Sequence, residues 1–358
     1  MKKKTVKVHS LNKKKVNEQK INSSEKKSLA SSELFAENVS VNTDRMYPML
    51  VMATMSSGKS TLINALLGEH ILPNKNEACT SKIYSIVDDD TATKSRVYVT
   101  HNNGLTDIKD VNIGEAIETA NNDETVSHVL ISGHVSGVLN TDKALLIIDT
   151  PGPNNSQNIQ HGKTTEDVLN NIYGGLIVYV INATQMGIND DRQVLDLLKK
   201  QLEKAPNTNV IFALNKIDQV DEEKESVEGY IEEVKKYLEE NGITSPIIIP
   251  VSALAALIFK KVLNNVELTR SEYRAFCEYY DLFRPKSYSL KAYAITDKER
   301  NPFEMIEVRG HKYKVSDILL AIENTGITLL EDEIQKNQIL SSGLIHNKIR
   351  VRRRSKND

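Results

Sequence analysis

The chain has 358 residues, 39% of them hydrophobic, and this length can bury the core of one large domain or of two. No apolar run is as long as a membrane span, and no apolar segment follows the lysine-rich start, so we expect a soluble, cytoplasmic protein. Cys79 and Cys277 form neither a metal-ligand spacing nor a disulfide framework, as is typical of a reducing compartment.

The net charge of −2 conceals two basic ends on an acidic body. Residues 1–28 carry a balance of +8 and residues 346–358 a balance of +5, which leaves −15 for the residues between them. We interpret the first segment as a disordered tail, because it has no apolar period, and the second as a basic C-terminal tail. Both tails are candidates for contacts with nucleic acid or an anionic membrane, and for residues 1–28 a purely solvating role is an equal alternative.

Strands and helices are predicted to alternate along the body, residues 29–345. Apolar runs indicate strands at 47–53, 82–87, 96–100, 128–135, 145–148, 176–181, 210–214 and 247–249. Helical periodicity indicates helices at 62–67, 113–121, 190–204, 224–241, 253–263, 271–283, 315–323 and 327–339.

The alternating runs at 82–87 and 96–100 suggest two antiparallel strands, whereas the fully apolar runs after them fit central strands buried on both faces. The fold class is therefore α/β, a mostly parallel sheet covered by helices on both faces. Residues 285–312 are expected to be irregular or β, and we interpret residues 265–313 as an insertion in the domain.

The stretch from Ala53 to Thr61, Ala-Thr-Met-Ser-Ser-Gly-Lys-Ser-Thr, lies between an apolar strand and a helix, which is the setting of a phosphate-binding loop. Lys59 is expected to reach the β- and γ-phosphates, and the Ser60 hydroxyl to coordinate Mg²⁺. Ala53 stands where this motif has a glycine, which alanine can replace only with a negative φ. The residues expected to surround the phosphates are Ser56, Ser57, Gly58, Lys59, Ser60 and Thr61.

A second motif, Asp149-Thr-Pro-Gly152, ends another apolar strand. Asp149 is expected to hold Mg²⁺, usually through water, and the Gly152 N–H to face the γ-phosphate. Thr80, in the polar loop between the two motifs, is the natural second hydroxyl for Mg²⁺, with Ser81 as the fallback.

The third motif, Asn215-Lys-Ile-Asp218, has the N-K-x-D form and predicts guanine recognition. Asp218 can accept from the N1–H and the exocyclic amino group of guanine, and adenine offers neither donor. Asn215 can brace the loop, the Lys216 stem can lie over the ring, and the turn at Ser252-Ala253 fits a backbone N–H for the guanine O6. The three motifs and the Ser252-Ala253 turn, in this order along the chain, predict that the protein binds GTP.

Hydrolysis of GTP to GDP and phosphate is a separate prediction. Pro153 occupies the position from which small GTPases orient the attacking water with a glutamine. The water must then be held by backbone, by a hydroxyl such as Ser56, by a monovalent cation or by a partner chain. We predict slow turnover in dilute monomer and faster turnover when molecules pair, with Ser56, Lys59, Thr80 and Gly152 as the candidate catalytic residues.

These motifs resemble those of the dynamin-like GTPases, specifically the bacterial branch. The resemblance is carried by residues 54–68, 71–76, 78–80 and 149–154, and it covers roughly residues 47–255. It implies a dynamin-type GTPase domain over residues 29–345, with extra elements between Thr80 and Asp149. It also implies dimerisation across the nucleotide face, and assistance to hydrolysis from a loop serine such as Ser56.

The resemblance implies candidate partners as well. The residues after Ser252 are too few for the long helical stalk of dynamins, so a second dynamin-like chain is a candidate partner. The chain is most similar to the bacterial members that bind a replication clamp, and Leu34-Phe35 matches the end of clamp-binding peptides without their leading glutamine.

Two alternative functions stay open. The first is a ribosome- or RNA-associated GTPase whose basic tails hold RNA. The second is a GTP-gated binding module with little hydrolysis, an alternative that Pro153 keeps open.

Overall fold

The computed structural model describes most of the body of the chain. The described residues are 46–54, 56–73, 82–89, 96–103, 106–109, 113–135, 137–140, 143–149, 175–185, 189–220, 226–285 and 305–341. The predictions for both charged tails, for Leu34-Phe35 and for Thr80, Ser81, Gly152 and Pro153 lie outside these residues.

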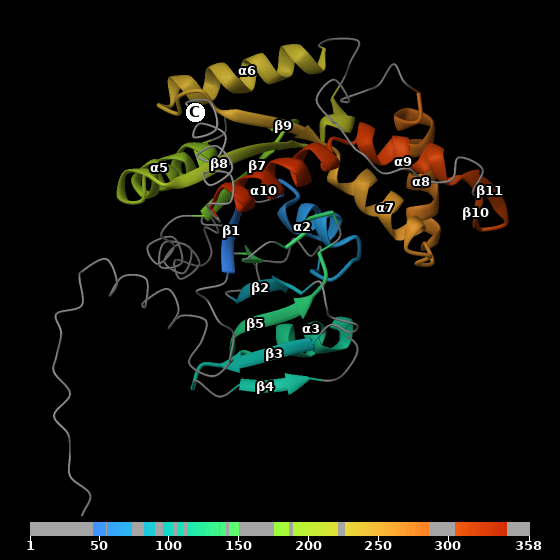
Figure 1. The fold of residues 1–358 in the computed structure, drawn as a ribbon, viewed down its shortest axis with the longest axis horizontal. Helices are drawn as coiled ribbons and strands as arrows, with labels where there is room; N and C mark the ends of the chain where they lie inside the picture. Colours follow the sequence, from blue (N-terminus) through green and yellow to red (C-terminus); the bar gives the residue numbers. More distant parts are fainter. Residues whose placement is uncertain are drawn as a thin grey trace, which may run out of the picture.

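A nine-stranded sheet runs through the described residues in the order β4-β3-β5-β2-β6-β1-β7-β8-β9 (Figure 1). The strands are β1 (Met46–Ala53), β2 (Ile83–Asp88), β3 (Arg96–His101), β4 (Thr106–Lys109), β5 (Val126–Gly133), β6 (Ala144–Asp149), β7 (Gly175–Asn182), β8 (Thr208–Asn215) and β9 (Ile247–Val251). From β6 to β9 all neighbours are parallel, while β2 pairs antiparallel with β6 and parallel with β5. The predicted α/β class with a mostly parallel sheet is confirmed.

The two strands predicted at 82–87 and 96–100 to be antiparallel are not neighbours in the sheet. Both strands form, as β2 and β3, and they run in opposite directions, but β5 lies between them and pairs with each. Alternation of apolar residues indicates a strand and says nothing about which distant strand will be its neighbour. The antiparallel neighbour of β3 on its other side is β4, which no pattern had indicated.

We call the part of the sheet beyond β6, made of β2, β3, β4 and β5, the extension. Helix α3 (Ile113–Asn122) lies against β3 and β5 of this extension. Lys82, almost fully buried, donates from Nζ to the carbonyl oxygens of Ala120 and Asn121 at the C-terminal end of α3. A positive charge there meets the negative end of the helix dipole. The Tyr84 hydroxyl on β2 also donates to the Asn121 side chain, so side-chain hydrogen bonds fix the end of α3 to this part of the sheet.

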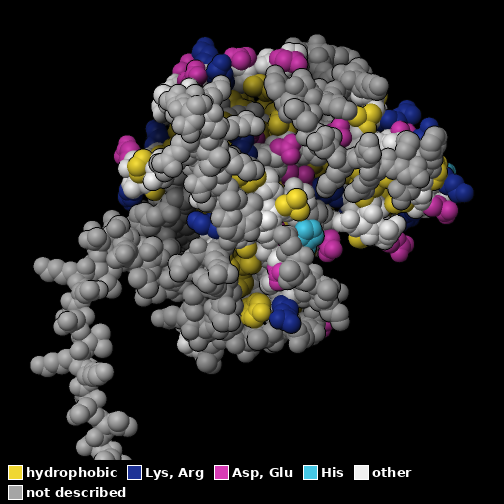
Figure 2. All heavy atoms as spheres, in the orientation of Figure 1, with side chains coloured by type: hydrophobic (Ala, Val, Ile, Leu, Met, Phe, Trp, Pro, Cys, Tyr) yellow, Lys and Arg dark blue, Asp and Glu magenta, His cyan; other side chains and the backbone are white. Residues whose placement is uncertain are grey.

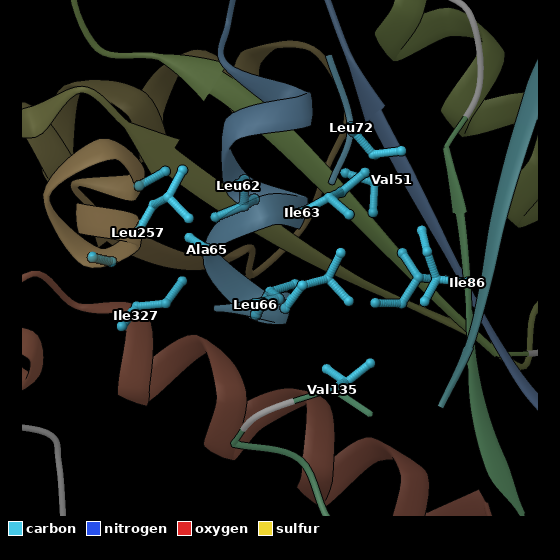
Figure 3. Packing of buried hydrophobic residues seen from close by; sticks show 14 of the residues in the cluster. Val51, Leu62, Ile63, Ala65, Leu66, Leu72, Ile86, Val135, Leu257 and Ile327 are labelled. Carbon is cyan, nitrogen blue, oxygen red and sulfur yellow. The ribbon is translucent and has the colours of Figure 1, made fainter. Parts of the chain in front are cut away.

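The remaining helices cover both faces of the parallel strands. They are α2 (Lys59–Leu67), α5 (Asn189–Lys204), α6 (Val227–Glu240), α7 (Ala253–Leu263), α8 (Arg270–Phe283), α9 (Val315–Asn324) and α10 (Ile327–Ser341). Side chains of β1 alternate between the faces: Val51 belongs to the core under α2, α7 and α10, and Leu50 to the core under α5 and α6. Figure 3 shows Leu62 and Leu66 of α2 meeting Leu257 of α7 and Ile327 of α10.

The C-terminal part packs onto α7 and onto the chain between β5 and β6. Lys260 of α7 and Glu331 of α10 form a buried ion pair, and Gly137 lies so close to the Glu331 carboxyl that a Cβ there would collide with it. Gln335 of α10 both accepts from and donates to the backbone of Leu139. Helix α10 is therefore an integral part of the packed domain.

The hairpin of β10 (Met305–Val308) and β11 (His311–Lys314) rests on the aromatic side chains of α8. Tyr313 meets the rings of Phe276 and Tyr280 edge to face, at centroid distances of 5.0 and 5.1 Å. In Figure 2 charged side chains of both signs lie side by side over α6. Lys235 and Glu232 of this helix form an ion pair. Within the described part of the chain, no helix is both long enough and apolar enough to span a bilayer.

Candidate nucleotide-binding site

The sheet brings the predicted motifs to one edge. Because β1, β6, β8 and β9 are parallel, their carboxyl ends lie at the same side of the sheet. Val51 is in register with Asp149, and Asn215 is in register with Val251, just before Ser252. The three motifs and the turn after β9, far apart in the sequence, therefore lie at the same side of the sheet.

The loop between β1 and α2 has the tight turn that a phosphate cradle requires. Ala53 is the last residue of β1, so its backbone is extended and needs no glycine. The turn is made instead at Ser56 and Gly58, with φ of 62° and 86°. The side chains of Thr54 and Ser57 bond to each other at 2.7 Å across the turn.

Helix α2 begins directly after this turn, with Gly58 as its N-cap and no side-chain cap among the described residues. The first intrahelical bond runs from the Leu62 N–H to the Gly58 carbonyl, at 2.9 Å. The N–H groups of the turn before Leu62 therefore have no partner within the helix. A helix start whose first N–H groups have no partner within the helix, at the positive end of its dipole, suits an anion.

Lys59 and Asp149 form an ion pair at the centre of this edge. The two side chains are 15% and 10% exposed, so both charges are largely shielded from water. Burial lowers the pKa of Lys59 from its ordinary value to about 7, while the neighbouring carboxylate favours the charged form of the amine. The predicted phosphate ligand and the predicted magnesium ligand thus neutralise each other in the structure.

Asn215 holds three loops together. Its Nδ2 donates to the Ser57 carbonyl at 2.9 Å, and its Oδ1 accepts from the Ala253 N–H at 3.1 Å. Lys216 reaches in the same direction, from Nζ to the Ser56 carbonyl at 2.8 Å. A Cβ on Gly58 would collide with Asn215 Nδ2, so the phosphate loop and the N-K-x-D loop are in direct contact.

Asp218 lies in the short helix η2 (Ile217–Gln219), half-buried beside this contact. The turn at the end of β9 is arranged differently from the simplest expectation. The Ala253 N–H donates to Asn215, and the N–H of the buried Ser252 donates to the Thr325 carbonyl at 2.9 Å. Both N–H groups of the turn that was predicted to meet the guanine O6 therefore donate within the chain in this structure.

Motif reasoning missed one side chain at the base end of the site. Burial, and after it the negative charge of the nearby Asp218, raise the pKa of Tyr279 on α8 above its ordinary value, so this side chain lies near the base end of the site. No motif includes Tyr279, and its only sequence signal is the helical spacing of aromatic residues in α8. Of the sequence-predicted site residues, Thr80 and Gly152 lie outside the described residues, and all the others lie at or next to this edge.

A family model described as the dynamin family matches residues 49–242, which is more than half of the chain. The chain belongs to the dynamin family. No curated protein matches it.

Two solved structures illustrate the comparison with known folds. A chain of an oligomerised bacterial dynamin pair, described as a mechanism for long-range sensing and tethering of membranes, is 17% identical with a TM-score of 0.46. The alignment covers 93% of the present chain and 49% of that one. Era, in complex with MgGDPNP and a fragment of 16S ribosomal RNA, is 19% identical with a TM-score of 0.35, over 62% of the present chain and 56% of that one. The present chain thus spans about half the length of each.

Proposed function

We propose that this protein is a dynamin-like GTPase that binds GTP with Mg²⁺ and hydrolyses it to GDP and phosphate. The observation that carries the proposal is the contact between the two nucleotide motifs, in which Asn215 joins Ser57 of the phosphate loop to Ala253 of the base turn. A phosphate cradle and a guanine acceptor, Asp218, held at one sheet edge by a shared side chain fit a single guanine nucleotide.

Guanine selectivity follows from the chemistry of Asp218. A carboxylate accepts two hydrogen bonds from the N1–H and 2-amino groups of guanine, whereas adenine would leave it without donors. The stem of Lys216 crosses from the base loop toward Ser56, and an apolar stem in that position can cover the face of the ring.

Nucleotide binding requires the Lys59–Asp149 pair to separate. Lys59 would move from the carboxylate to the β- and γ-phosphates, where it neutralises charge that builds up on the leaving group. Asp149 and the Ser60 hydroxyl are hard oxygen ligands of the kind that Mg²⁺ prefers. Asp149 pairs with the Lys59 ammonium in the structure, so its position suits a positive charge. When bound, Mg²⁺ supplies charge neutralisation across the β- and γ-phosphates.

Hydrolysis transfers the γ-phosphoryl group to water: the bond from phosphorus to the β–γ bridging oxygen breaks, and GDP leaves with that oxygen. Ser56 is exposed and held at positive φ at the open end of the loop, where its hydroxyl can orient the water. Thr80 and Gly152 complete the proposed catalytic set. Pro153 has no side-chain donor or acceptor to orient the attacking water, so a monovalent cation or a partner chain would supply that contact. Pairing of two chains across this face, or recruitment of a second dynamin-like chain, is the proposed output of the cycle.

The first experiment is phosphate release from GTP at increasing protein concentration, with molecular mass measured in GDP and in GDP with an aluminium fluoride mimic. Specific activity and mass that rise together support a dimerisation-activated GTPase. A monomer that binds GTP and releases no phosphate even when concentrated would contradict the proposed hydrolysis and favour a GTP-gated module. Nucleic acid that copurifies and is lost as salt rises would favour the RNA-associated alternative.

Two variants test the site itself. Lys59→Ala should abolish measurable GTP and GDP binding, because the phosphates lose their only proposed lysine contact from α2. Asp218→Asn should reduce the preference for GTP over ATP while phosphate contacts persist. Unchanged base selectivity in Asp218→Asn would refute the assignment of this carboxylate to guanine.

A further inference from the structure

Asp149, the proposed Mg²⁺ ligand, lies between two neighbouring strands at the end of β6. On one side it is in register with Val51 of β1, and on the other side with Tyr84 of β2. Because β2 runs antiparallel to β6, the chain enters β2 at the edge of the sheet where β6 ends. The start of β2 is therefore a direct neighbour of the proposed metal ligand.

Tyr84 and Asp149 also share one face of the sheet. Residues paired directly across two strands carry their side chains on the same face, with Cβ atoms about 4.5–5.5 Å apart. Tyr84 belongs to the core under α2, and Lys59 of α2 reaches Asp149 from that side. The ring of Tyr84, a residue only 3% exposed, is thus the cross-strand neighbour of the carboxylate that would hold the metal.

The Tyr84 side chain is fixed by helix α3. Its hydroxyl donates to the side-chain oxygen of Asn121, near the C-terminal end of the helix. Burial raises the pKa of Tyr84 above its ordinary value, so the hydroxyl keeps its proton and stays a donor. A ring that is buried along its length and bonded at its tip has little freedom to move away from Asp149.

Lys82, two residues before Tyr84, is attached to the same helix end. Its ammonium donates to the carbonyl oxygens of Ala120 and Asn121, at 2.8 Å to the second, and the residue is 5% exposed. A hydrogen bond from a charged donor is stronger than one between neutral groups, and this one meets the negative end of the helix dipole. The start of β2 is therefore held by α3 as well as by its neighbouring strands.

We propose that Tyr84 and Lys82 are positioning residues for the magnesium site. Their bonds to α3 hold the start of β2, and this strand holds Asp149 where its carboxylate can meet the metal. This inference rests on the proposed function. It gives the extension a role in that function, because β2 and α3 support the metal ligand from the side opposite β1. Both residues act through Asp149 and not on the nucleotide itself.

The test measures GDP binding over a range of Mg²⁺ concentrations, and in EDTA, for Tyr84→Phe and Tyr280→Phe. Tyr280 of α8 is the matched control, because its hydroxyl donates to Asp317 of α9 at 3.1 Å, in the C-terminal part of the domain. Both variants keep the ring and remove one hydroxyl. Lys82→Met and Lys82→Arg form a second pair, in which only arginine keeps a charged donor for the two carbonyls.

We expect Tyr84→Phe to raise the Mg²⁺ concentration that half-saturates GDP binding by about fivefold, the size of one hydrogen bond. Lys82→Met should raise it at least as much, and Lys82→Arg should restore most of the loss. GDP affinity in EDTA should not change, because Asp149 is proposed to hold the metal and not the phosphates. Tyr280→Phe should change neither quantity, and in an Asp149→Asn background Tyr84→Phe should have no further effect.

Urea melts of the protein without metal or nucleotide give an independent readout. If Tyr84 acts through Asp149, the losses of unfolding free energy caused by Tyr84→Phe and Asp149→Asn should not add in the double variant. The losses caused by Tyr280→Phe and Asp149→Asn should add, because these residues share no contact among the described residues.

Several outcomes would overturn the inference. An unchanged Mg²⁺ dependence in Tyr84→Phe, or a shift matched by Tyr280→Phe, would show that the hydroxyl does not position the metal ligand. Equal weakening of GDP binding in Mg²⁺ and in EDTA would show a general loss of structure at this edge. Additive losses of Tyr84→Phe and Asp149→Asn would show that the two residues act independently. The proposed function fails separately, if the unaltered protein binds no GDP in either condition.

Discussion

Asn215→Ala is the substitution that most directly tests how the site is built. Asn215 is 2% exposed and serves two buried partners, the Ser57 carbonyl and the Ala253 N–H. Alanine removes both bonds without breaking the strand. Each buried partner then loses its bond at a cost of about 1–3 kcal/mol, so the free energy of unfolding should fall by about 2–6 kcal/mol, less whatever an entering water restores.

Asn182→Ala is the matched control. Asn182 ends β7 in register with Asn215 and is 4% exposed, but among the described residues its side chain bonds only to Thr184 and Gln185 in its own exposed turn. Water can replace those bonds, so we expect a loss of about 1 kcal/mol. Asn215→Ala should also weaken GDP binding, because the phosphate and base loops are no longer joined, whereas Asn182→Ala should not.

The assay is denaturation by urea followed by far-ultraviolet circular dichroism, since the chain has no tryptophan for fluorescence. An unchanged m-value would confirm that the midpoint shift reports stability. Equal losses for the two variants, or a loss below about 1 kcal/mol for Asn215→Ala, would refute the view that one side chain holds the loops together.

Three further predictions concern other described residues. Burial lowers the pKa of His128 from 6.5 to about 4, so this imidazole binds a proton more tightly in the unfolded chain than in the folded protein. The free energy of unfolding should therefore fall by about 3 kcal/mol as the pH drops from 6.5 to 4. His128→Gln should flatten that part of a pH series of urea melts. Lys260→Met leaves Glu331 buried without its ammonium partner and should cost about 3–5 kcal/mol in the same urea assay, and adding Glu331→Leu should recover most of it. Gly58→Ala puts a Cβ against Asn215 at a positive φ, so GDP titrations should show at least roughly tenfold weaker binding; unchanged affinity would contradict the close contact.

Much of the fold could be predicted because its strands are buried on both faces. Runs such as Leu145–Ile148 are apolar at every position, and helices such as Ala253–Leu263 repeat at helical spacing, so element type and order follow from local pattern. Which strands pair is a property of the whole chain. Local pattern predicted that β2 and β3 are antiparallel, as they are, but it did not indicate that β5 lies between them.

The candidate site likewise has residues that local sequence predicts and contacts that depend on the whole fold. Lys59, Asp149, Asn215 and Asp218 could be named because each belongs to a short motif with a chemical reason for its residue types. The pairing of Lys59 with Asp149, and the position of Tyr279 near Asp218, depend on where β6 and α8 lie in the assembled domain. Local sequence carries no signal for such contacts. The role of each motif residue in catalysis stays a prediction.

The docking of α10 has a consequence for where this domain can be cut. The family match ends at residue 242, yet the ion pair with Lys260 and the backbone contacts at Leu139 come from residues 331 and 335. A fragment that stops before Ile327 would leave the Lys260 ammonium inside the protein without its carboxylate and would uncover the core beneath α10. The cooperative folding unit is therefore larger than the matched segment, and limited proteolysis of the folded protein should spare α10 from Ile327 through Gln338.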